Sequence, residues 1–398
     1  MRNHSYILRR FNIGAIAVAC TLQFFPSVFL SERVQAQEGG NPGGTEGTPA
    51  GTVFNWVNLQ SDIAGVAQNT DPNLSCAWGL ALNPYTNNFW IADNNPGAST
   101  CYQADGTPVP LVPSNTSPVF TVTIPLAGTI DPTSLTNSGA SSWPTGVVFN
   151  PPIANGFLIG ANAQPATLIF AAESGTISAW NPDVNLSNAV IAVDNSAKGA
   201  VYKGLALATL PSGDVRLYAT DFHNGKVDVF DSTFTPVTPA GGFVDPNLPA
   251  GFAPFGIANI NGLIYVTYAK QLLPAAVEED NAPGNGFVDA FDLDGKLQQR
   301  LISQGPLNSP WGLAVVPDAF GKFGPQTLLV GNYGDGHVNA FDISTGVGTY
   351  VGTLQNAKGQ PIAIDSLFAL FFYGSRLYFT AGIAGESHGL FGYIVNVQ

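Results

Sequence analysis

Three histidines and the acidic residues beside them are the side chains in this sequence best suited to chemistry. His223, His337 and His388 each lie two residues after a carboxylate. Imidazole nitrogens together with carboxylate oxygens form the donor set that Zn²⁺ and similar divalent ions use. The candidate metal ligands on this hypothesis are Glu173, Asp221, His223, Asn332, Asp335, Glu386 and His388. The alternative is that the histidines are solvated residues that stabilise turns.

A serine motif offers a second kind of chemistry. The segment Gly385-Glu386-Ser387-His388-Gly389 fits the pattern G-x-S-x-G of a nucleophilic serine. That motif works on a tight turn from a strand into a helix. Here it lies between two expected strands, so the pattern alone favours a structural turn.

These residues are positioned by six copies of one motif, typified by Pro310-Trp311-Gly312-Leu313-Ala314. The copies lie at 77–82, 143–148, 202–207, 254–259, 309–316 and 365–370, which are 52 to 66 residues apart. A period of this size is typical of repeat architectures, and four short strands fill it.

Each copy continues in the same way. A second strand ends on a polar residue, as in 328–332, and a third follows a glycine with alternating apolar and polar residues, as in 336–342. Period-two alternation indicates strands with one covered face. Small residues in the first strand suit close approach at a common axis, and third-strand aromatics suit the wedges between sheets. The sequence predicts an all-β, six-bladed β-propeller.

A ring of sheets must be closed, since an open ring leaves an edge strand with unpaired backbone N–H and C=O groups. The last copy ends after its third strand, near residues 389–394, and an additional strand is expected at 54–59. We expect these two segments to pair.

In such a ring, the loops before each first strand and after each second strand share one face. We expect a ligand site at the channel mouth on that face, formed by Asp93, Asn94, Lys203, Lys270, Trp78, Trp143 and Trp311. The tryptophans either stack on a sugar there or pack between blades.

The repeated phrase Asp-Pro-Asn-Leu, at 71–74 and 245–248, has a simpler interpretation. Asp-Pro favours turn initiation, so we expect a structural loop that leads into a strand.

The N-terminus is typical of a targeting segment. Arg9 and Arg10 precede an apolar run, and Val34-Gln35-Ala36 fits a signal-peptidase site. We expect a signal peptide over 1–36, a Gly/Pro-rich flexible tether over 37–52 and one propeller domain over 53–398, exported to the periplasm or cell exterior. Attachment through a lipid at Cys20 and an uncleaved anchor helix are the alternatives, and only these would tie the chain to a membrane.

The net charge of the chain limits the classes of partner that it can bind. Removal of 1–36 leaves 10 basic and 26 acidic residues, a net charge of −16. Such a surface repels nucleic acid. A protein, a saccharide or a small molecule remains as a partner, and we expect a monomer.

Two cysteines, Cys76 and Cys101, follow the expected cleavage site. Exported chains meet an oxidising compartment, which favours a disulfide between them. Two buried thiols are the alternative.

The segments Pro310–Ala314, Leu329–Asn332 and Gly336–Asp342 resemble an NHL-type repeat, whose propellers are related to the gluconolactonase and regucalcin group. More closely, nearly the whole mature chain resembles a family of exported bacterial proteins of uncharacterised function, through phrases such as 69–74, 221–225, 249–255 and 388–392. The gluconolactonase likeness implies a Ca²⁺ site of two carboxylates and an amide, for which Glu173, Asp221 and Asn332 are the candidates. The NHL likeness allows a metal-dependent lyase.

No catalytic constellation stands out from the repeats. We therefore expect a binding or scaffold module. The alternative is a metal-dependent (Ca²⁺ or Zn²⁺) lactonase-like hydrolase or lyase with its site at the channel mouth.

Overall fold

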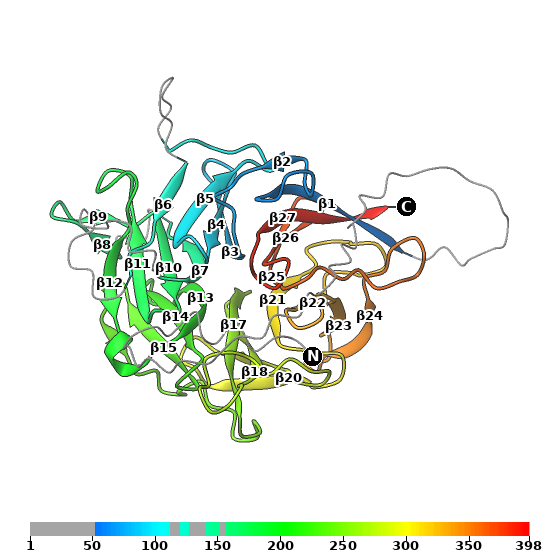
Figure 1. Ribbon diagram of the computed structural model, residues 1–398. Helices are drawn as coiled ribbons and strands as arrows, with labels where there is room; N and C mark the ends of the chain where they lie inside the picture. Colours follow the sequence, from blue (N-terminus) through cyan, green and yellow to red (C-terminus); the bar gives the residue numbers. More distant parts are fainter. Residues whose placement is uncertain (1–51, 112–119, 127–140, 152–155, 398) are drawn as a thin grey trace, which may run out of the picture. The chain divides into compact units, whose positions relative to one another are not determined.

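The computed structural model (Figure 1) describes residues 52–111, 120–126, 141–151 and 156–397. They belong to one compact unit. The predicted signal peptide (1–36) and all but the last residue of the predicted tether (37–52) lie outside the described residues. No helix in the described part is long and apolar enough to cross a membrane.

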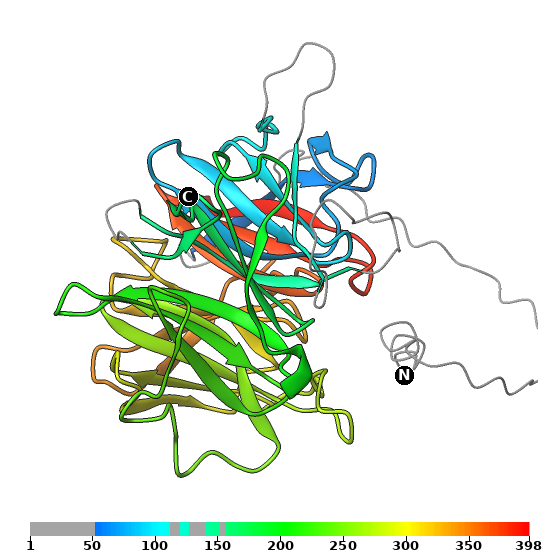
Figure 2. The ribbon, with the colours of Figure 1, turned by 90° about the vertical axis from the view of Figure 1, so that its left-hand side faces the viewer.

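The described chain forms six antiparallel sheets arranged as the blades of a propeller (Figures 1 and 2). Blade 1 contains β3 (Ala77–Asn83), β4 (Asn88–Asp93), β5 (Ala98–Tyr102) and β6 (Thr121–Thr123). Blade 2 contains β7 (Pro144–Phe149), β10 (Leu168–Ala172), β11 (Thr176–Trp180) and β12 (Val190–Asp194). Blade 3 contains β13 (Tyr202–Thr209), β14 (Val215–Asp221), β15 (Lys226–Asp231) and β16 (Pro236–Val237).

The remaining blades follow the same order. Blade 4 contains β17 (Phe252–Ile260), β18 (Leu263–Lys270), β19 (Phe287–Phe291) and β20 (Leu297–Ser303). Blade 5 contains β21 (Pro310–Val315), β22 (Thr327–Asn332), β23 (Val338–Asp342) and β24 (Thr349–Thr353). Blade 6 contains β25 (Leu367–Tyr373), β26 (Arg376–Ala381), β27 (Leu390–Val397), β1 (Val53–Ser61) and β2 (Asn69–Thr70). A small hairpin of β8 (Leu158–Ile159) and β9 (Gln164–Pro165) and one 3-10 turn, η3 (Ser196–Lys198), complete the described elements.

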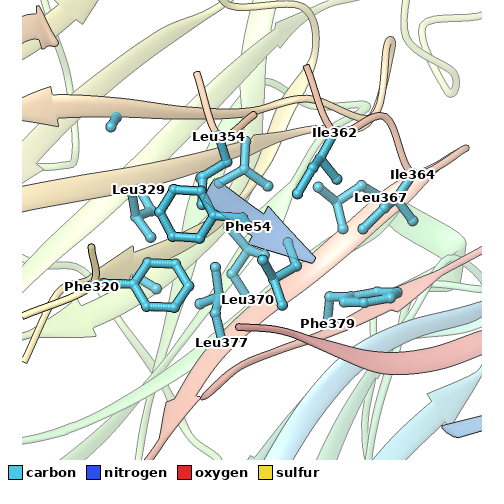
Figure 3. Close-up of a cluster of buried hydrophobic side chains, with 14 of the residues drawn as sticks. Phe54, Phe320, Leu329, Leu354, Ile362, Ile364, Leu367, Leu370, Leu377 and Phe379 are labelled. Atoms are coloured by element: carbon cyan, nitrogen blue, oxygen red, sulfur yellow. The ribbon is translucent and has the colours of Figure 1, made fainter. Parts of the chain in front are cut away.

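The predicted closure is confirmed. Strand β1 runs antiparallel to β27, with Trp56 opposite Ile394. The N-terminal strand thus supplies the fourth strand of the last blade (Figure 1). Its Phe54 side chain is buried against blade 5, with its ring centroid 4.8 Å from that of Phe320 (Figure 3). Burying a phenylalanine contributes about 1.5–3 kcal/mol, so β1 stabilises the closure through its side chains as well as its backbone.

The inner strands approach one another too closely for ordinary side chains at the repeated glycines. A Cβ on Gly256 would lie 2.1 Å from the Trp311 carbonyl oxygen of the next blade, and one on Gly146 would lie 2.5 Å from the Leu205 nitrogen. A hydroxyl also joins two inner strands, since Thr145 Oγ1 of β7 donates to the Tyr202 carbonyl of β13 at 2.8 Å. The predicted role of small residues at the axis is confirmed.

Third-strand aromatics fill the wedges between blades, as the repeat predicts. Trp180 of β11 packs against Trp90 of blade 1, with ring centroids 5.1 Å apart. Phe230 of blade 3 is buried in the core between blades 2 and 3, and Phe291 of blade 4 is buried in the core between blades 3 and 4.

The two Asp-Pro-Asn-Leu phrases are turns, as predicted. The Asp71 side chain accepts a hydrogen bond from the Asn73 nitrogen at 2.9 Å, and Asp245 accepts one from the Asn247 nitrogen at 2.8 Å. Each is an Asx turn, in which the carboxylate closes the loop on itself.

The predicted disulfide is not formed. Cys76 and Cys101 are both buried thiols. Cys76 precedes β3, whereas Cys101 lies on β5 opposite Trp90, and β4 separates the two strands. Two strand spacings amount to roughly 9.6 Å, which exceeds the roughly 7 Å that a disulfide can span between Cα atoms.

Candidate functional site

All six blades send side chains to one end of the propeller axis, where they form what we call the axial cluster. Its members lie before an inner strand or after a second strand, the positions that the repeat predicts for a site. The axial cluster consists of Asn94 from blade 1, Glu173 from blade 2, Lys203 from blade 3, Glu278 and Glu279 from blade 4, Tyr333 from blade 5 and Glu386 from blade 6.

Lys203 is the centre of the axial cluster and is fully buried. Its Nζ lies 2.5 Å from Glu173 Oε1, 3.5 Å from Glu278 Oε2 and 3.9 Å from Glu279 Oε2. Burial of a charge is costly unless it is paired, so these carboxylates account for the lysine's place in the interior.

An aromatic floor underlies the lysine. The Lys203 ammonium lies 5.2 Å from the ring centroid of Trp78 and 5.8 Å from that of Phe222. Trp78 stacks on Phe368 with centroids 3.9 Å apart. Trp311 joins the floor and donates its indole N–H to the Lys203 carbonyl at 2.9 Å. The tryptophans at positions 78 and 311 thus pack at the axis itself.

Asn94 holds the Glu173 carboxylate from the blade 1 side. Its Nδ2 donates to Glu173 Oε2 at 3.2 Å and to the Pro144 carbonyl at 3.3 Å. Asn94 is fully buried, yet its Oδ1 accepts no hydrogen bond. Glu173 is therefore oriented by two neighbours, and one buried acceptor remains unsatisfied.

Glu279 has a strongly altered acidity. Burial raises the pKa of its carboxyl to about 8, although Lys203 acts in the opposite direction. The neighbouring carboxylates Glu278, Glu386 and Glu173 raise it further. Its Oε2 accepts no hydrogen bond. Glu279 therefore carries a proton at neutral pH, and a cation placed beside it would favour loss of that proton.

Tyr333 and Glu386 form a hydrogen-bonded pair within the axial cluster. The tyrosine hydroxyl donates to Glu386 Oε1. Burial and the Glu386 carboxylate raise the pKa of Tyr333 well above its usual range, so it stays a hydrogen-bond donor. Cys76 Sγ lies 3.9 Å from Glu386 Oε2 and accepts from the Trp78 indole at 3.2 Å.

The structure brings four of the predicted polar site residues together: Asn94, Glu173, Lys203 and Glu386. The predicted histidines lie apart from them. His223 is exposed, with Nδ1 3.1 Å from the Ala275 carbonyl, and His388 Nδ1 lies 2.8 Å from Asp62 Oδ2.

The other predicted residues have local partners. Asn332 donates to Asp335 Oδ1 at 3.1 Å, and Asp221 accepts from Asn224 at 2.7 Å. Lys270 pairs with Asp280 at 2.9 Å, near the surface. Two predicted residues remain. Asp93 is fully buried, and burial raises the pKa of its carboxyl well above the usual range. Trp143 is half-buried and has a φ of +54°.

The grouping needed for a metal ion is absent from the described part of the chain. No three or more His, Cys, Asp or Glu side chains are arranged there to hold one. Ser387 lies in the loop between β26 and β27, and no helix follows it. That loop therefore lacks the strand-to-helix turn on which a nucleophilic serine depends.

Glu278, Glu279 and Tyr333 are absent from the residues proposed on sequence grounds. Tyr333 directly follows Asn332, the polar end of a second strand. Glu278 and Glu279 lie in the loop between β18 and β19. This loop is longer than the equivalent loops of the other blades, so the repeat offers no aligned position for these two residues. The signal that was available is the run Glu278-Glu279-Asp280, three acids in a chain with only 27.

An open hollow of about 460 Å³ lies away from the axial cluster, along blade 5. Its lining includes Lys322, Gln326, Asp342 and Val351. None of these four side chains is buried.

Solved structures support the fold. The chain resembles a glucose dehydrogenase with a TM-score of 0.50 and 14% identity, over 86% of this chain and 99% of that one. It also resembles a gluconolactonase from Xanthomonas campestris with a TM-score of 0.39 and 16% identity, over 64% of this chain and 86% of that one. At 14% identity the likeness to the glucose dehydrogenase shows a common fold alone.

Sequence relatives place the chain more closely. No protein-family model matches it. It is 32% identical over 393 residues to uncharacterized protein L690 of Acanthamoeba polyphaga mimivirus, covering 95% of each chain. It is also 32% identical over 361 residues to uncharacterized protein R648 of the same virus, covering 88% of this chain and 82% of that one. These relatives are viral, so they lend no support to the expected bacterial and exported family. The chain belongs to the family that contains the mimivirus proteins L690 and R648.

Proposed function

We propose that this protein is a binding module that holds a small ligand at the axial cluster. The observation that carries the proposal is that six blades, spread from Asn94 to Glu386 along the chain, converge on one buried lysine. Ligand sites on propellers form where loops of several blades meet. Parts of Glu278, Tyr333 and Glu386 remain exposed, which gives a ligand access.

The internal pairing of the cluster favours binding over metal-dependent hydrolysis. Glu173 accepts from the Lys203 ammonium, and Glu386 accepts from the Tyr333 hydroxyl. A Ca²⁺ or Zn²⁺ ion that used Glu173 Oε1 as a ligand would have to displace the Lys203 ammonium, which lies 2.5 Å from that oxygen. The lactonase-like or lyase alternative therefore requires a rearranged cluster.

Intrinsic fluorescence tests the binding proposal, since Trp78 and Trp311 lie in the floor of the cluster. We would titrate the protein with glucose, glutarate, 1,5-diaminopentane, CaCl₂ and ZnCl₂, and follow emission together with the melting temperature. The proposal expects one organic probe to change both, and the Glu386→Gln variant to abolish the response. A response to Ca²⁺ or Zn²⁺ alone would favour the hydrolase alternative. No response to any probe would overturn the binding module.

We also propose that residues 1–36 direct export. The support is the sequence of that segment: Arg9 and Arg10, the apolar run after them, and Val34-Gln35-Ala36. Expression of the full chain in a secreting host, followed by mass measurement of the secreted product, tests it. An N-terminus at residue 37 is expected, and retention of the whole chain inside the cell would contradict export.

A further inference from the structure

We propose that Asn185, and not Asn73, is the acceptor of an N-linked glycan when the chain is exported. This inference rests on the proposed export and goes beyond the axial cluster. The tripeptide Asn-Leu-Ser occurs twice in the described part of the chain, at 73–75 and 185–187. Both copies fit the acceptor pattern Asn-x-Ser/Thr, which is modified on surface loops of secreted proteins. The structural settings of one tripeptide can therefore be compared.

The loop that carries Asn185 connects β11 and β12 of blade 2. Glu173 of the axial cluster comes before β11 and Asn185 comes after it, so the whole strand separates them. A strand of this length spans roughly 17 Å. Asn185 therefore lies toward the other end of the propeller, and a glycan on it leaves the axial cluster uncovered.

The Asn185 side chain forms an Asx turn that leaves its nitrogen available. Its Oδ1 accepts hydrogen bonds from the backbone nitrogens of Ser187 at 3.1 Å and Asn188 at 3.0 Å. Its Nδ2 donates no hydrogen bond to any described residue, and Asn185 is partly exposed beside Leu186, which is 37% exposed. Hydrogen bonds to the amide oxygen draw electron density from the nitrogen and make the Nδ2 protons easier to remove. The reacting atom is thus activated and accessible.

The other copy of the tripeptide is tied into the fold. The Asn73 Nδ2 donates to Asp71 Oδ1 at 2.8 Å. Leu74 is fully buried, and Ser75 Oγ donates to the Ser387 carbonyl at 3.3 Å. An enzyme that must bind all three residues of the pattern cannot do so here without breaking these contacts.

The modification forms one bond and breaks one. The Asn185 Nδ2 attacks C1 of the first sugar of an oligosaccharide linked to a lipid diphosphate, which the export machinery of a eukaryotic cell supplies. A bond forms between Nδ2 and C1, and the bond from C1 to the diphosphate oxygen breaks. The lipid diphosphate leaves with the electron pair of that bond, and one Nδ2 proton passes to a base of the transferring enzyme.

Expression of the full chain in a secreting insect-cell host tests the inference. The secreted product is mapped by peptide mass before and after treatment with peptide N-glycosidase, which converts a glycosylated Asn to Asp. We expect the fraction of chains modified at Asn185 to be at least tenfold larger than the fraction modified at Asn73. Two further copies of the pattern, at 3–5 and 115–117, lie outside the described residues and give separate peptides.

The possible outcomes separate this inference from export. Equal modification of Asn73 and Asn185 would show that the tripeptide alone decides, which would overturn the inference. A secreted product without a glycan at Asn185 would overturn it too, while export would stand. Retention of the whole chain inside the cell would overturn both.

Two variants of one residue separate the acceptor pattern from the fold. Ser187→Ala removes the hydroxyl that the pattern requires, whereas Ser187→Thr keeps it, and both keep the backbone nitrogen that closes the Asx turn. The Ser187 hydroxyl accepts from Asn188 Nδ2 at 3.1 Å on a loop that is partly exposed, so both variants should fold. We expect Ser187→Ala to lose the glycan and Ser187→Thr to retain it, with equal melting temperatures after deglycosylation. A glycan that persists at Asn185 in Ser187→Ala would contradict the assignment.

Discussion

Two ionic clusters in this molecule have similar compositions but connect different parts of the fold. The axial cluster surrounds Lys203. A second one, the blade 4 cluster, consists of Arg300, Asp245, Asp289 and Tyr268. Each has one base with more than one carboxylate, and each contains a buried acid of raised pKa. Burial raises the pKa of Asp289 to about 7, compared with about 8 for Glu279.

The difference lies in what each cluster connects. Arg300 on β20 reaches Asp289 on the adjacent strand β19 and Asp245 in the turn before β17, and so joins parts of one blade. It also lies over Phe287, with its guanidinium 5.0 Å from the ring centroid. That is a structural brace. The axial cluster joins six blades at a point where no backbone continuity requires it, which is the arrangement expected of a binding site.

The largest effect is expected from Lys203→Met. Methionine keeps the apolar contact with Trp78 but leaves Glu173 as a buried carboxylate without its cation. Removal of one partner from a buried ion pair costs about 3–5 kcal/mol in the free energy of unfolding. Urea denaturation at pH 7 measures the loss.

The matched control for that variant is Lys226→Met, whose lysine is about half exposed and pairs with Asp228 at 2.6 Å. Its other partner, Asp221 at 3.7 Å, is buried, but solvent reaches the lysine itself and screens both pairs, so we expect a loss of about 1 kcal/mol. Equal destabilisation by the two variants would show that Lys203 does not compensate buried charge.

Arg300→Met should have the next largest effect, a loss of about 2 kcal/mol. Arg300 is partly exposed, but its partners Asp245 and Asp289 are almost fully buried and would lose a charged donor. Because the brace lies away from the axis, affinity for the organic probe that binds at the axial cluster should stay within twofold of the wild type. A tenfold loss of affinity in this variant would contradict the distinction between the structural brace around Arg300 and the axial cluster.

The two raised pKa values predict different pH windows for stability. A carboxyl whose pKa is raised by folding binds its proton in the folded state while the unfolded state has lost it, so stability falls as pH rises through that interval. For Glu279 the interval runs from 4.5 to about 8, and for Asp289 from 3.8 to about 7. Between pH 7 and pH 8 Asp289 no longer contributes, whereas Glu279 still does, with a slope of at most about 1.4 kcal/mol per pH unit.

Glu279→Gln should therefore reduce the loss of stability between pH 7 and pH 8, and Asp289→Asn should leave that loss unchanged. Denaturation midpoints at half-unit pH steps measure both. A wild-type curve that is flat from pH 5 to pH 8 would contradict both assignments.

The fold could be predicted because each requirement of a propeller is visible in local sequence. The glycine in Trp311-Gly312-Leu313 recurs because the next inner strand leaves no space for a Cβ, and the alternation after Gly336 follows from a strand with one covered face. The expected pairing of residues 54–59 followed from counting strands in the last copy.

The site could be predicted only in part, because the repeat marks positions and not the lengths of loops. Asn94, Glu173 and Lys203 occupy repeat positions and were identified. Glu279 lies in the loop between β18 and β19, which is longer than the equivalent loop of every other blade in the described part of the chain. The disulfide expected between Cys76 and Cys101 was wrong because their separation in sequence does not reveal that β4 lies between them.

The smallest effect is expected from Lys270→Ala, which tests where the axial cluster ends. Lys270 closes β18 and lies on the same face of the propeller, but its pair with Asp280 is exposed on both sides, at 43% and 41%. Solvent screens such a pair, so the free energy of unfolding should change by less than about 1 kcal/mol. Affinity for the organic probe that binds at the axial cluster should change by less than twofold, and the change should vanish at 0.5 M NaCl, where charges beyond about 5 Å no longer interact strongly. A loss of affinity that persists in salt would place Lys270 in contact with the ligand and extend the axial cluster to the rim of blade 4.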